Sequence, residues 1–257
     1  RFISKAAVDY YSTAIDLSQK ADRASLHLKR ALVWRRVGEF GRSISDGENA
    51  AQIAEENHDF EILYKALGAI RYGHRNLGDL NAARTFSQRA LLAGEKANHA
   101  VFRIREILAL GHIEMDQGNL KKAKATFEDG LRDARDLEDR DAIVRALFGL
   151  GGVARAEGKS HEAIRAWTKV IEIRRAADQL DGVAAALSNL SMIEIDAGDY
   201  EAAYRHARES LEISKQLGLT GYVATTLQRM VRLKKIKGDL EGAREDLIER
   251  LRLHREI

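Results

Sequence analysis

Histidines and acidic residues are the side chains of this chain that could do acid–base or metal chemistry. The chain has eight histidines in 257 residues and no cysteine. A helical zinc site needs two histidines three or four residues apart, with a carboxylate nearby, and no two histidines here have that spacing. The sequence therefore predicts no metal, no cofactor and no catalytic residue, and we expect the chain not to be an enzyme.

Gly158-Lys159-Ser160 has the residue types that end a phosphate-binding P-loop. That loop requires a glycine five residues before Gly158, where this chain has Val153, and Gly152 is one residue out of register. The loop also follows a strand, whereas a helical pattern precedes Gly158. The interpretation that fits both facts is a turn between two helices.

Composition narrows the class of protein. Hydrophobic residues make up 45% of the chain and charged residues 32%, which is too apolar for a disordered chain and too charged for a membrane protein. No stretch approaches 18 consecutive apolar residues, so we expect no membrane span. The net charge is only +3, so that binding to nucleic acid is not demanded by charge. The absence of cysteine fits a reducing compartment, and we expect a cytoplasmic protein.

Six glycines recur every 40 residues, and this is the strongest pattern in the sequence. They are Gly38, Gly78, Gly118, Gly158, Gly198 and Gly238. Small residues recur five positions after them, at Ser43, Ala83, Ala123, Ala163, Ala203 and Ala243. Apolar residues recur eight positions before them in five of the six copies. Because these spacings follow the helical period, each unit is predicted to be a helix, a tight glycine turn and a second helix.

The pattern predicts two helices in each unit. The first helices are expected near 22–37, 61–77, 101–117, 141–157, 181–197 and 221–237. The second helices are expected near 40–56, 80–97, 120–137, 160–177, 200–216 and 240–255. Asp79, Asn119, Asp199 and Asp239 follow the turn glycines and are residue types that cap helix N-termini.

These residues resemble the tetratricopeptide repeat (TPR) family. Leu150-Gly151, followed by Gly158, Ala163 and Trp167, is similar to the family pattern of Leu-Gly, then Ala, then an aromatic residue. The resemblance implies an all-α, right-handed α-solenoid of TPR-type helix hairpins. One solenoid would cover 1–257, with a partial repeat at 1–20 and repeats at about 21–59, 60–99, 100–139, 140–179, 180–219 and 220–257.

The sequence departs from the family in three ways. The period is 40 rather than 34 residues, proline is absent, and Arg30 stands where the other repeats have Ile, Leu or Met. Repeats of this length resemble those of cell-polarity scaffolds and of sensor arms in bacterial multidomain regulators. The resemblance implies a scaffold that binds a protein or peptide. A ligand-sensing arm of a larger signalling protein is the alternative.

In the TPR family the first helices line a concave groove that usually binds the partner. The residues that this alignment places in the groove form a basic rim around an apolar, aromatic floor. They are Lys65, Tyr72, Arg75, Arg105, His112, Arg145, Phe148, Arg155, Asn189, Met192 and Arg229. Since arginine forks suit carboxylates, we expect an acidic partner segment. The alternative is that these residues belong to an ordinary solvated helix face and bind no partner.

Some family members clamp the carboxylate at a peptide C-terminus with lysine, asparagine and arginine. Asn189 and Arg229 fit the later positions of that clamp, but Phe148, Gly152 and Thr225 occupy the others. The family clamp is therefore not expected here.

Two further expectations concern other partners. Arg229, Arg232, Lys234, Lys235 and Lys237 crowd one helix, but a basic helix C-terminus is also favoured by the helix dipole, so that we do not expect nucleic-acid binding. The sequence starts inside a second helix and stops in another. We therefore expect either further domains of the same chain or end-to-end self-association through apolar stripes. Those stripes contain Ala7, Tyr11 and Ala14 at one end and Leu247, Leu251, Leu253 and Ile257 at the other.

Overall fold

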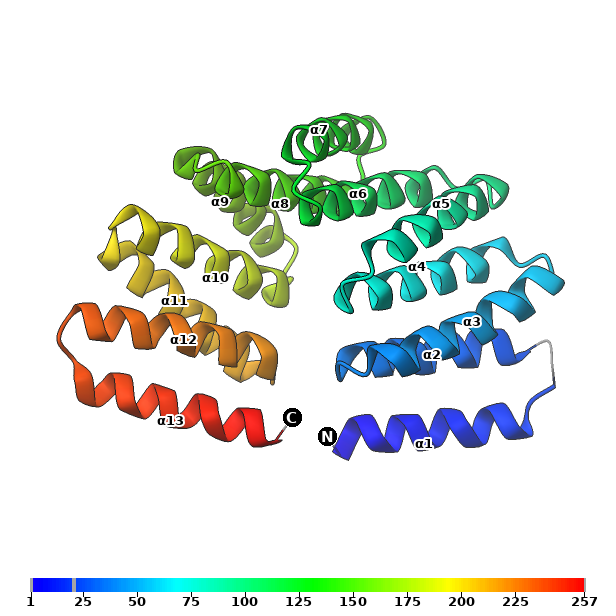
Figure 1. Ribbon diagram of the computed structural model, residues 1–257, viewed down its shortest axis with the longest axis horizontal. Coiled ribbons are helices and arrows are strands. Elements are labelled where there is room, and N and C mark those ends of the chain that lie inside the picture. Colours follow the sequence, from blue (N-terminus) through cyan, green and yellow to red (C-terminus); the bar gives the residue numbers. More distant parts are fainter. Residues whose placement is uncertain (1, 20–21, 257) are drawn as a thin grey trace. The chain divides into compact units, whose positions relative to one another are not determined.

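The computed structural model describes residues 2–19 and 22–256 of the chain. Every regular element in that part is a helix. In chain order these are α1 (Phe2–Leu17), α2 (Arg23–Arg36), α3 (Phe40–Glu56), α4 (Phe60–Asn76), α5 (Leu80–Lys96), α6 (Ala100–Asp116), α7 (Leu120–Asp136), α8 (Arg140–Ala156), α9 (Ser160–Ala176), α10 (Leu180–Ala197), α11 (Tyr200–Gln216), α12 (Thr220–Ile236) and α13 (Leu240–Glu256) (Figure 1). From α2 to α13, each helix end lies within one residue of its predicted position.

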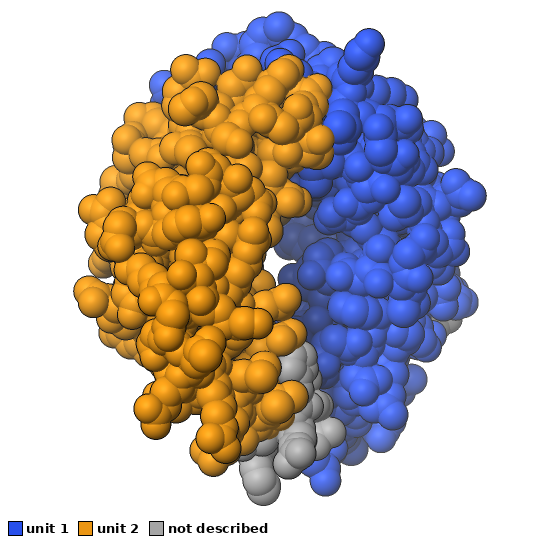
Figure 2. Space-filling model, turned by 60° about the vertical axis from the view of Figure 1, so that its left-hand side comes forward, with its two compact units in different colours: residues 1–142 blue, residues 143–257 orange. Residues whose placement is uncertain are grey.

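The chain divides into two compact units, residues 1–142 and 143–257, which Figure 2 colours separately. Unit 1 holds α1 to α7 and the first residues of α8, and unit 2 holds the rest of α8 and α9 to α13. Within each unit, consecutive helices pack on one another as hairpins. The all-α solenoid class is therefore confirmed. The continuity of one right-handed solenoid through both units stays a prediction.

The six periodic glycines make the turns inside the hairpins. Their φ angles lie between 75° and 84°, in the left-handed region that costs other residues energy. Asp79, Asp199 and Asp239 accept a hydrogen bond from the backbone N–H three residues later, as predicted. The prediction is wrong for Asn119, whose side chain makes no capping bond. Its backbone carbonyl accepts from Ala123, as the carbonyls of Asp79, Asp199 and Asp239 accept from their equivalents, so the helix begins there without a side-chain cap.

The turns between consecutive hairpins also recur every 40 residues, a pattern that the sequence interpretation missed. His58, Asn98, Glu138 and Asp178 have φ angles between 51° and 57°, and Gly218 occupies the fifth position with a φ of 65°. Asn, Asp and His adopt this left-handed conformation more readily than other residues with a side chain, whereas Glu does not. Strain at these turns is therefore uneven along the chain.

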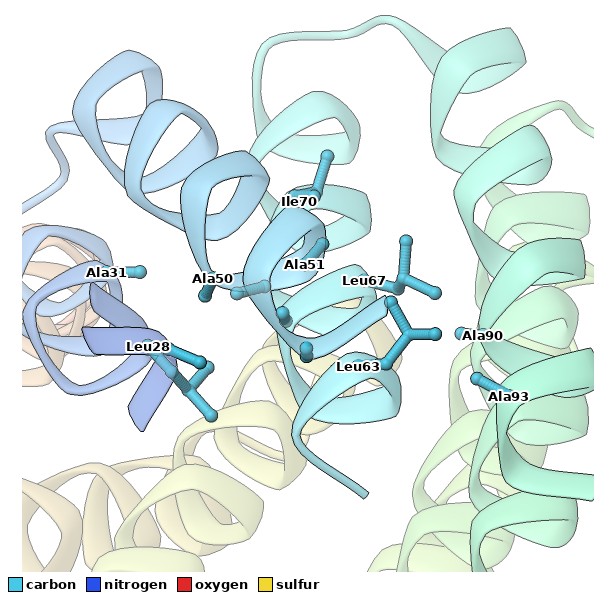
Figure 3. Packing of buried hydrophobic residues seen from close by; sticks show 13 residues of the cluster. Leu28, Ala31, Ala50, Ala51, Leu63, Leu67, Ile70, Ala90 and Ala93 are labelled. Atoms are coloured by element: carbon cyan, nitrogen blue, oxygen red, sulfur yellow. The ribbon is translucent and has the colours of Figure 1, made fainter. Parts of the chain in front are cut away.

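Small residues allow the paired helices to approach closely. The side chains of Ala123, Ala163 and Ala203 are fully buried, as their position after the turn predicts. Gly151 packs against the ring of Trp167, since a Cβ atom there would lie 2.4 Å from the indole Nε1. Figure 3 shows the same principle in unit 1, where alanines of α3 and α5 and leucines of α4 share one cluster.

Arg30 departs from the repeat pattern because it forms an ion pair with a buried carboxylate. Its Nε and Nη2 donate to the two oxygens of Asp46 at 2.7 Å, and Asp46 is 4% exposed. His27 Nδ1 lies 2.9 Å from Asp46, and Trp34 Nε1 donates to it at 3.1 Å. Burial raises the pKa of Asp46, but the hydrogen bonds and charges of Arg30 and His27 outweigh it, so the net shift is downward. The first full repeat thus replaces an apolar contact with a polar cluster.

The expected terminal stripes are exposed in part. Leu247 and Leu251 of α13 are 41% and 52% exposed, whereas Ala7, Tyr11 and Ala14 of α1 are half-buried. Ile257 lies outside the described residues. Self-association through these stripes stays a prediction.

Candidate partner-binding face

The first helix of each hairpin lies beside the first helix of the next hairpin within its unit. We call the exposed side chains of α2, α4 and α6 the first-helix face of unit 1, and those of α8, α10 and α12 the first-helix face of unit 2. Side chains reach across these faces from one hairpin to the next. In unit 1 the Arg35 guanidinium lies over the ring of Tyr72, 4.9 Å from its centroid, which joins α2 to α4. In unit 2, Arg232 of α12 donates to Asp196 of α10 at 3.1 Å.

The basic side chains predicted for the face of unit 1 have carboxylate partners. Arg75 donates to Asp116 through both Nε and Nη2, at 2.5 and 3.2 Å, so that α4 is tied to α6. Lys65 pairs with Glu61 one turn earlier in the same helix, at 2.5 Å. Arg105 Nη2 lies 3.9 Å from Asp139. These charges are neutralised within the chain, and each pair remains partly open to water.

A buried ion pair lies beneath this face. Glu106 of α6 is 1% exposed, and Arg71 Nε of α4 lies 2.9 Å from its carboxylate. Ser87 donates a short hydrogen bond to the same carboxylate. Burial raises the pKa of Glu106, although Arg71 and Ser87 oppose that shift. Removing a single partner of such a pair leaves a buried charge uncompensated.

The predicted aromatic floor of unit 1 is largely engaged in the fold. Tyr72 and His112 are both half-buried. The ring of His112 meets the edge of Phe127 with 4.9 Å between centroids, and Tyr72 is tilted against Phe40 at 6.2 Å. Contacts within the fold therefore occupy part of both rings.

Unit 2 places Phe148, Asn189 and Met192 at half-buried positions of its first-helix face. The backbone carbonyl of Phe148 accepts a 3.2 Å hydrogen bond from Trp167 Nε1, and the two rings are tilted against each other at 6.3 Å. Arg155 and Arg145 are exposed on α8. The structure thus brings an aromatic ring, a thioether, an amide and arginines onto adjacent helices of one unit.

Arg229 of α12 differs from the arginines of unit 1. Its Nη1 donates to Ser188 Oγ of α10, and its Nη2 lies 3.9 Å from the sulfur of Met192. Burial, and then the positive charge of Arg155, lower the pKa of Arg229. Over the described residues, Arg229 and Arg155 form no ion pair with a carboxylate.

The other basic residues at the end of α12 are mostly paired. Arg232 contacts Asp196, Lys234 lies 2.8 Å from Asp246, and Lys237 lies 2.8 Å from Glu201. A surface that binds phosphates offers cations free to replace counterions. The pairing therefore removes most of the support for nucleic-acid binding at this helix.

Gly158-Lys159-Ser160 forms a helical turn, as predicted. Gly158 has a φ of 75° after α8, and Lys159 Nζ lies 2.8 Å from Glu157. In residues 2–19 and 22–256, no three His, Asp or Glu side chains are grouped so that they could hold a metal ion. No helix in the same residues is long and apolar enough to cross a membrane.

The sequence interpretation missed the partners of the face arginines. Asp116, Asp196 and Ser188 carry the contacts that decide which arginine is neutralised. The sequence pattern that could have revealed these partners is a spacing of 41 residues, which is one repeat plus one residue. Arg75 and Asp116 are 41 residues apart, and so are Ser188 and Arg229.

Comparison with known proteins agrees with this fold. Sequence models described as tetratricopeptide repeat match residues 103–176 and 183–217. None of the curated proteins matches the chain. The chain contains tetratricopeptide repeats in these residues, and the helices outside them also pack as hairpins.

Solved structures with the same fold are similar over nearly the whole chain. A Rap protein complexed with competence and sporulation factor matches with a TM-score of 0.74 and 16% identity, covering 99% of this chain and 72% of that one. NprR in complex with its cognate peptide NprX matches with a TM-score of 0.75 and 14% identity, covering 94% and 69%. Aspartyl phosphate phosphatase F from Bacillus subtilis matches with a TM-score of 0.69 and 13% identity, covering 95% and 63%. At these identities the likeness concerns the fold.

Proposed function

We propose that this chain binds a peptide or a peptide segment of another protein on its first-helix faces and has no catalytic step of its own. The observation that carries the proposal is the makeup of the face in unit 2, where Phe148, Asn189 and Met192 lie half-buried beside arginines. Half-buried apolar and aromatic groups ringed by donors suit peptide recognition. Two solved structures of this fold are complexes, one of a Rap protein with competence and sporulation factor and one of NprR with its cognate peptide.

The bound segment in this proposal is acidic. Arginine presents a planar fork of donors that matches a carboxylate, and arginines are the cations that both faces use most. Lys65, Arg105 and Arg145 lie on the proposed basic rim, where Lys65 and Arg105 also contact Glu61 and Asp139. The absence of cysteine is the reason for placing this binding in the cytoplasm.

Site-specific crosslinking tests which face binds. The purified chain carries p-benzoylphenylalanine in place of Met192 on the first-helix face of unit 2, and in a second sample in place of Lys169 on α9. Lys169 is well exposed and lies on a second helix. The probe is a pool of N-acetylated, C-amidated heptapeptides. We expect peptide adducts from position 192 and few from position 169, and the reverse would contradict the proposal.

A second candidate function is a ligand-sensing arm of a larger regulator. The Rap and NprR structures extend beyond the matched region, since this chain covers 72% and 69% of them. In this reading peptide binding changes the activity of a domain linked to the repeats. The test is the activity of the natural full-length protein with and without the peptide that the crosslinking identifies. A peptide that binds but leaves that activity unchanged would favour the scaffold.

A further inference from the structure

Arg155 of α8 and Arg229 of α12 are cations on the first-helix face of unit 2 that pair with no carboxylate of the described residues. Arg155 is exposed and Arg229 is half-buried, and the positive charge of Arg155 adds to burial in lowering the pKa of Arg229. The groups that Arg229 touches, Ser188 Oγ and Met192 Sδ, are both neutral. A half-buried guanidinium without a counter-ion is unfavourable unless an anion joins it.

The equivalent of Arg155 in unit 1 is Arg75, which has a carboxylate partner that Arg155 lacks. Arg75 and Arg155 both precede their turn glycine by three residues, and Arg75 pairs with Asp116, which lies 41 residues later. The residue 41 positions after Arg155 is Asp196, so a carboxylate is present at the matching position. Asp196 instead accepts a hydrogen bond from Arg232 at 3.1 Å. The carboxylate that could serve Arg155 is therefore engaged by a different arginine.

The Arg229 side chain is held ready for a ligand. Ser188 is buried, and its hydroxyl lies 3.3 Å from Thr226 Oγ1, which in turn lies 3.4 Å from Ser210 Oγ. Ser210 donates to the backbone carbonyl of Ala184 at 2.8 Å. This buried chain of hydroxyls fixes one Nη atom of Arg229. A guanidinium has five N–H donors, so most of them remain for a second partner.

We propose that Arg229 binds one carboxylate group of an acidic peptide, with Asn189 and Met192 of α10 beside it and the unpaired charge of Arg155 on the same face. This inference rests on the proposed function and names the chemical group that the face recognises. It also places the recognition in unit 2, because the predicted cations Lys65, Arg75 and Arg105 are already paired inside unit 1. The site differs from the TPR carboxylate clamp, whose remaining positions hold Phe148, Gly152 and Thr225.

A matched peptide pool tests the site. Every heptapeptide is N-acetylated and C-amidated, and each member with one Asp or Glu has a twin with Asn or Gln. We expect the immobilised chain to enrich the acidic twin by about tenfold or more, which is the effect of one charge-assisted contact. Arg229→Gln is expected to lower that ratio to near one while the amide twins still bind.

Lys237→Gln is the matched control, because Lys237 directly follows the same helix and is paired with Glu201. We expect it to keep the preference for the acidic twin. A preference that survives Arg229→Gln would overturn the inference and leave the proposed function standing. No acidic preference in the unmodified chain would overturn the inference and the acidic character of the partner, and would leave peptide binding standing. Failure of the whole pool to bind would overturn the proposed function, and the inference with it.

The source of the carboxylate and a purely structural role are tested separately. A second pool with free C-termini and no acidic side chains distinguishes a side-chain carboxylate, which we expect, from a terminal one. Binding of only the second pool would contradict the side-chain assignment. Without peptide, Arg229→Met is expected to leave the melting temperature unchanged or raise it, because a repelled charge is removed. A fall of several degrees would show that Arg229 serves the fold and would overturn the site.

Discussion

Unit 1 and unit 2 both carry arginines on their first helices, and Arg75 and Arg155 stand at equivalent positions of their repeats, yet the surroundings of these arginines differ. In unit 1, Arg30, Arg71 and Arg75 meet the carboxylates of Asp46, Glu106 and Asp116. In unit 2, Arg229 meets a serine and a thioether, and Arg155 has no carboxylate partner over the described residues. A column of basic residues in a repeat alignment therefore does not define a binding face. The position of the acids one repeat away decides which cations remain for a ligand.

The largest effect is expected where a unit 1 carboxylate is buried. Asp46→Ala leaves Arg30 facing His27 and Trp34 without its counter-ion, which costs about 3 kcal/mol in the free energy of unfolding. Asp116→Ala is the matched control, because its pair with Arg75 is roughly 30% exposed and such pairs contribute about 0.5 kcal/mol. Chemical denaturation measures both. Equal losses would show that the Asp46 cluster is not a structural unit.

A smaller loss is expected where a helix pair approaches most closely. In unit 2, Gly151→Ala forces a Cβ atom to within 2.4 Å of Trp167 Nε1, and the indole is also hydrogen-bonded to Phe148. The cost is about 2 kcal/mol. In unit 1, the equivalent Gly111 has its nearest such contact at 2.9 Å, with Phe127, and Gly111→Ala is expected to cost less. A larger loss for Gly111→Ala would contradict the packing described for unit 2.

The turns between hairpins give effects of about 1 kcal/mol and opposite sign in the two units. Glu138→Gly in unit 1 relieves a φ of 52° and should raise the melting temperature. Gly218→Ala in unit 2 imposes the same strain at a φ of 65° and should lower it. Changes of the same sign at both turns, measured by thermal unfolding, would mean that backbone strain is not what distinguishes them.

The smallest effect concerns binding in unit 1. Asp116→Ala removes the partner of Arg75 and exposes a cation like that of Arg229. We expect the preference of the chain for acidic heptapeptides to rise by about twofold, as a surface charge in high dielectric allows. An unchanged preference would mean that an unpaired arginine on this face does not suffice for recognition.

The hairpins could be predicted from the sequence because their cause is local. A left-handed glycine and a helical stripe of apolar residues recur every 40 residues, and each acts within its own turn or helix. The failure at Asn119 shows the limit of residue type: the backbone bond that begins the helix is the same at Asn119 as at the capping Asp residues, and only the side-chain bond is missing.

The state of the face arginines could not be predicted. Arg75 and Asp116 are 41 residues apart, and Asp196 and Arg232 are 36 residues apart. Whether each pair forms depends on the direction in which the side chains of two different helices point. Arg30 stood out in the alignment as an anomaly, but its partner Asp46 became evident only when α2 and α3 were placed side by side. Residue type showed where cations gather, and only geometry showed which of them are neutralised.

The most direct test compares Arg75→Gln with Arg229→Gln in binding one acidic heptapeptide, taken from the pool, by calorimetry. If Arg75 is satisfied by Asp116 and Arg229 awaits a ligand, Arg229→Gln weakens binding about tenfold or more, and Arg75→Gln changes it by less than about twofold. Equal weakening by both substitutions, or a larger effect of Arg75→Gln, would contradict the distinction between the two units.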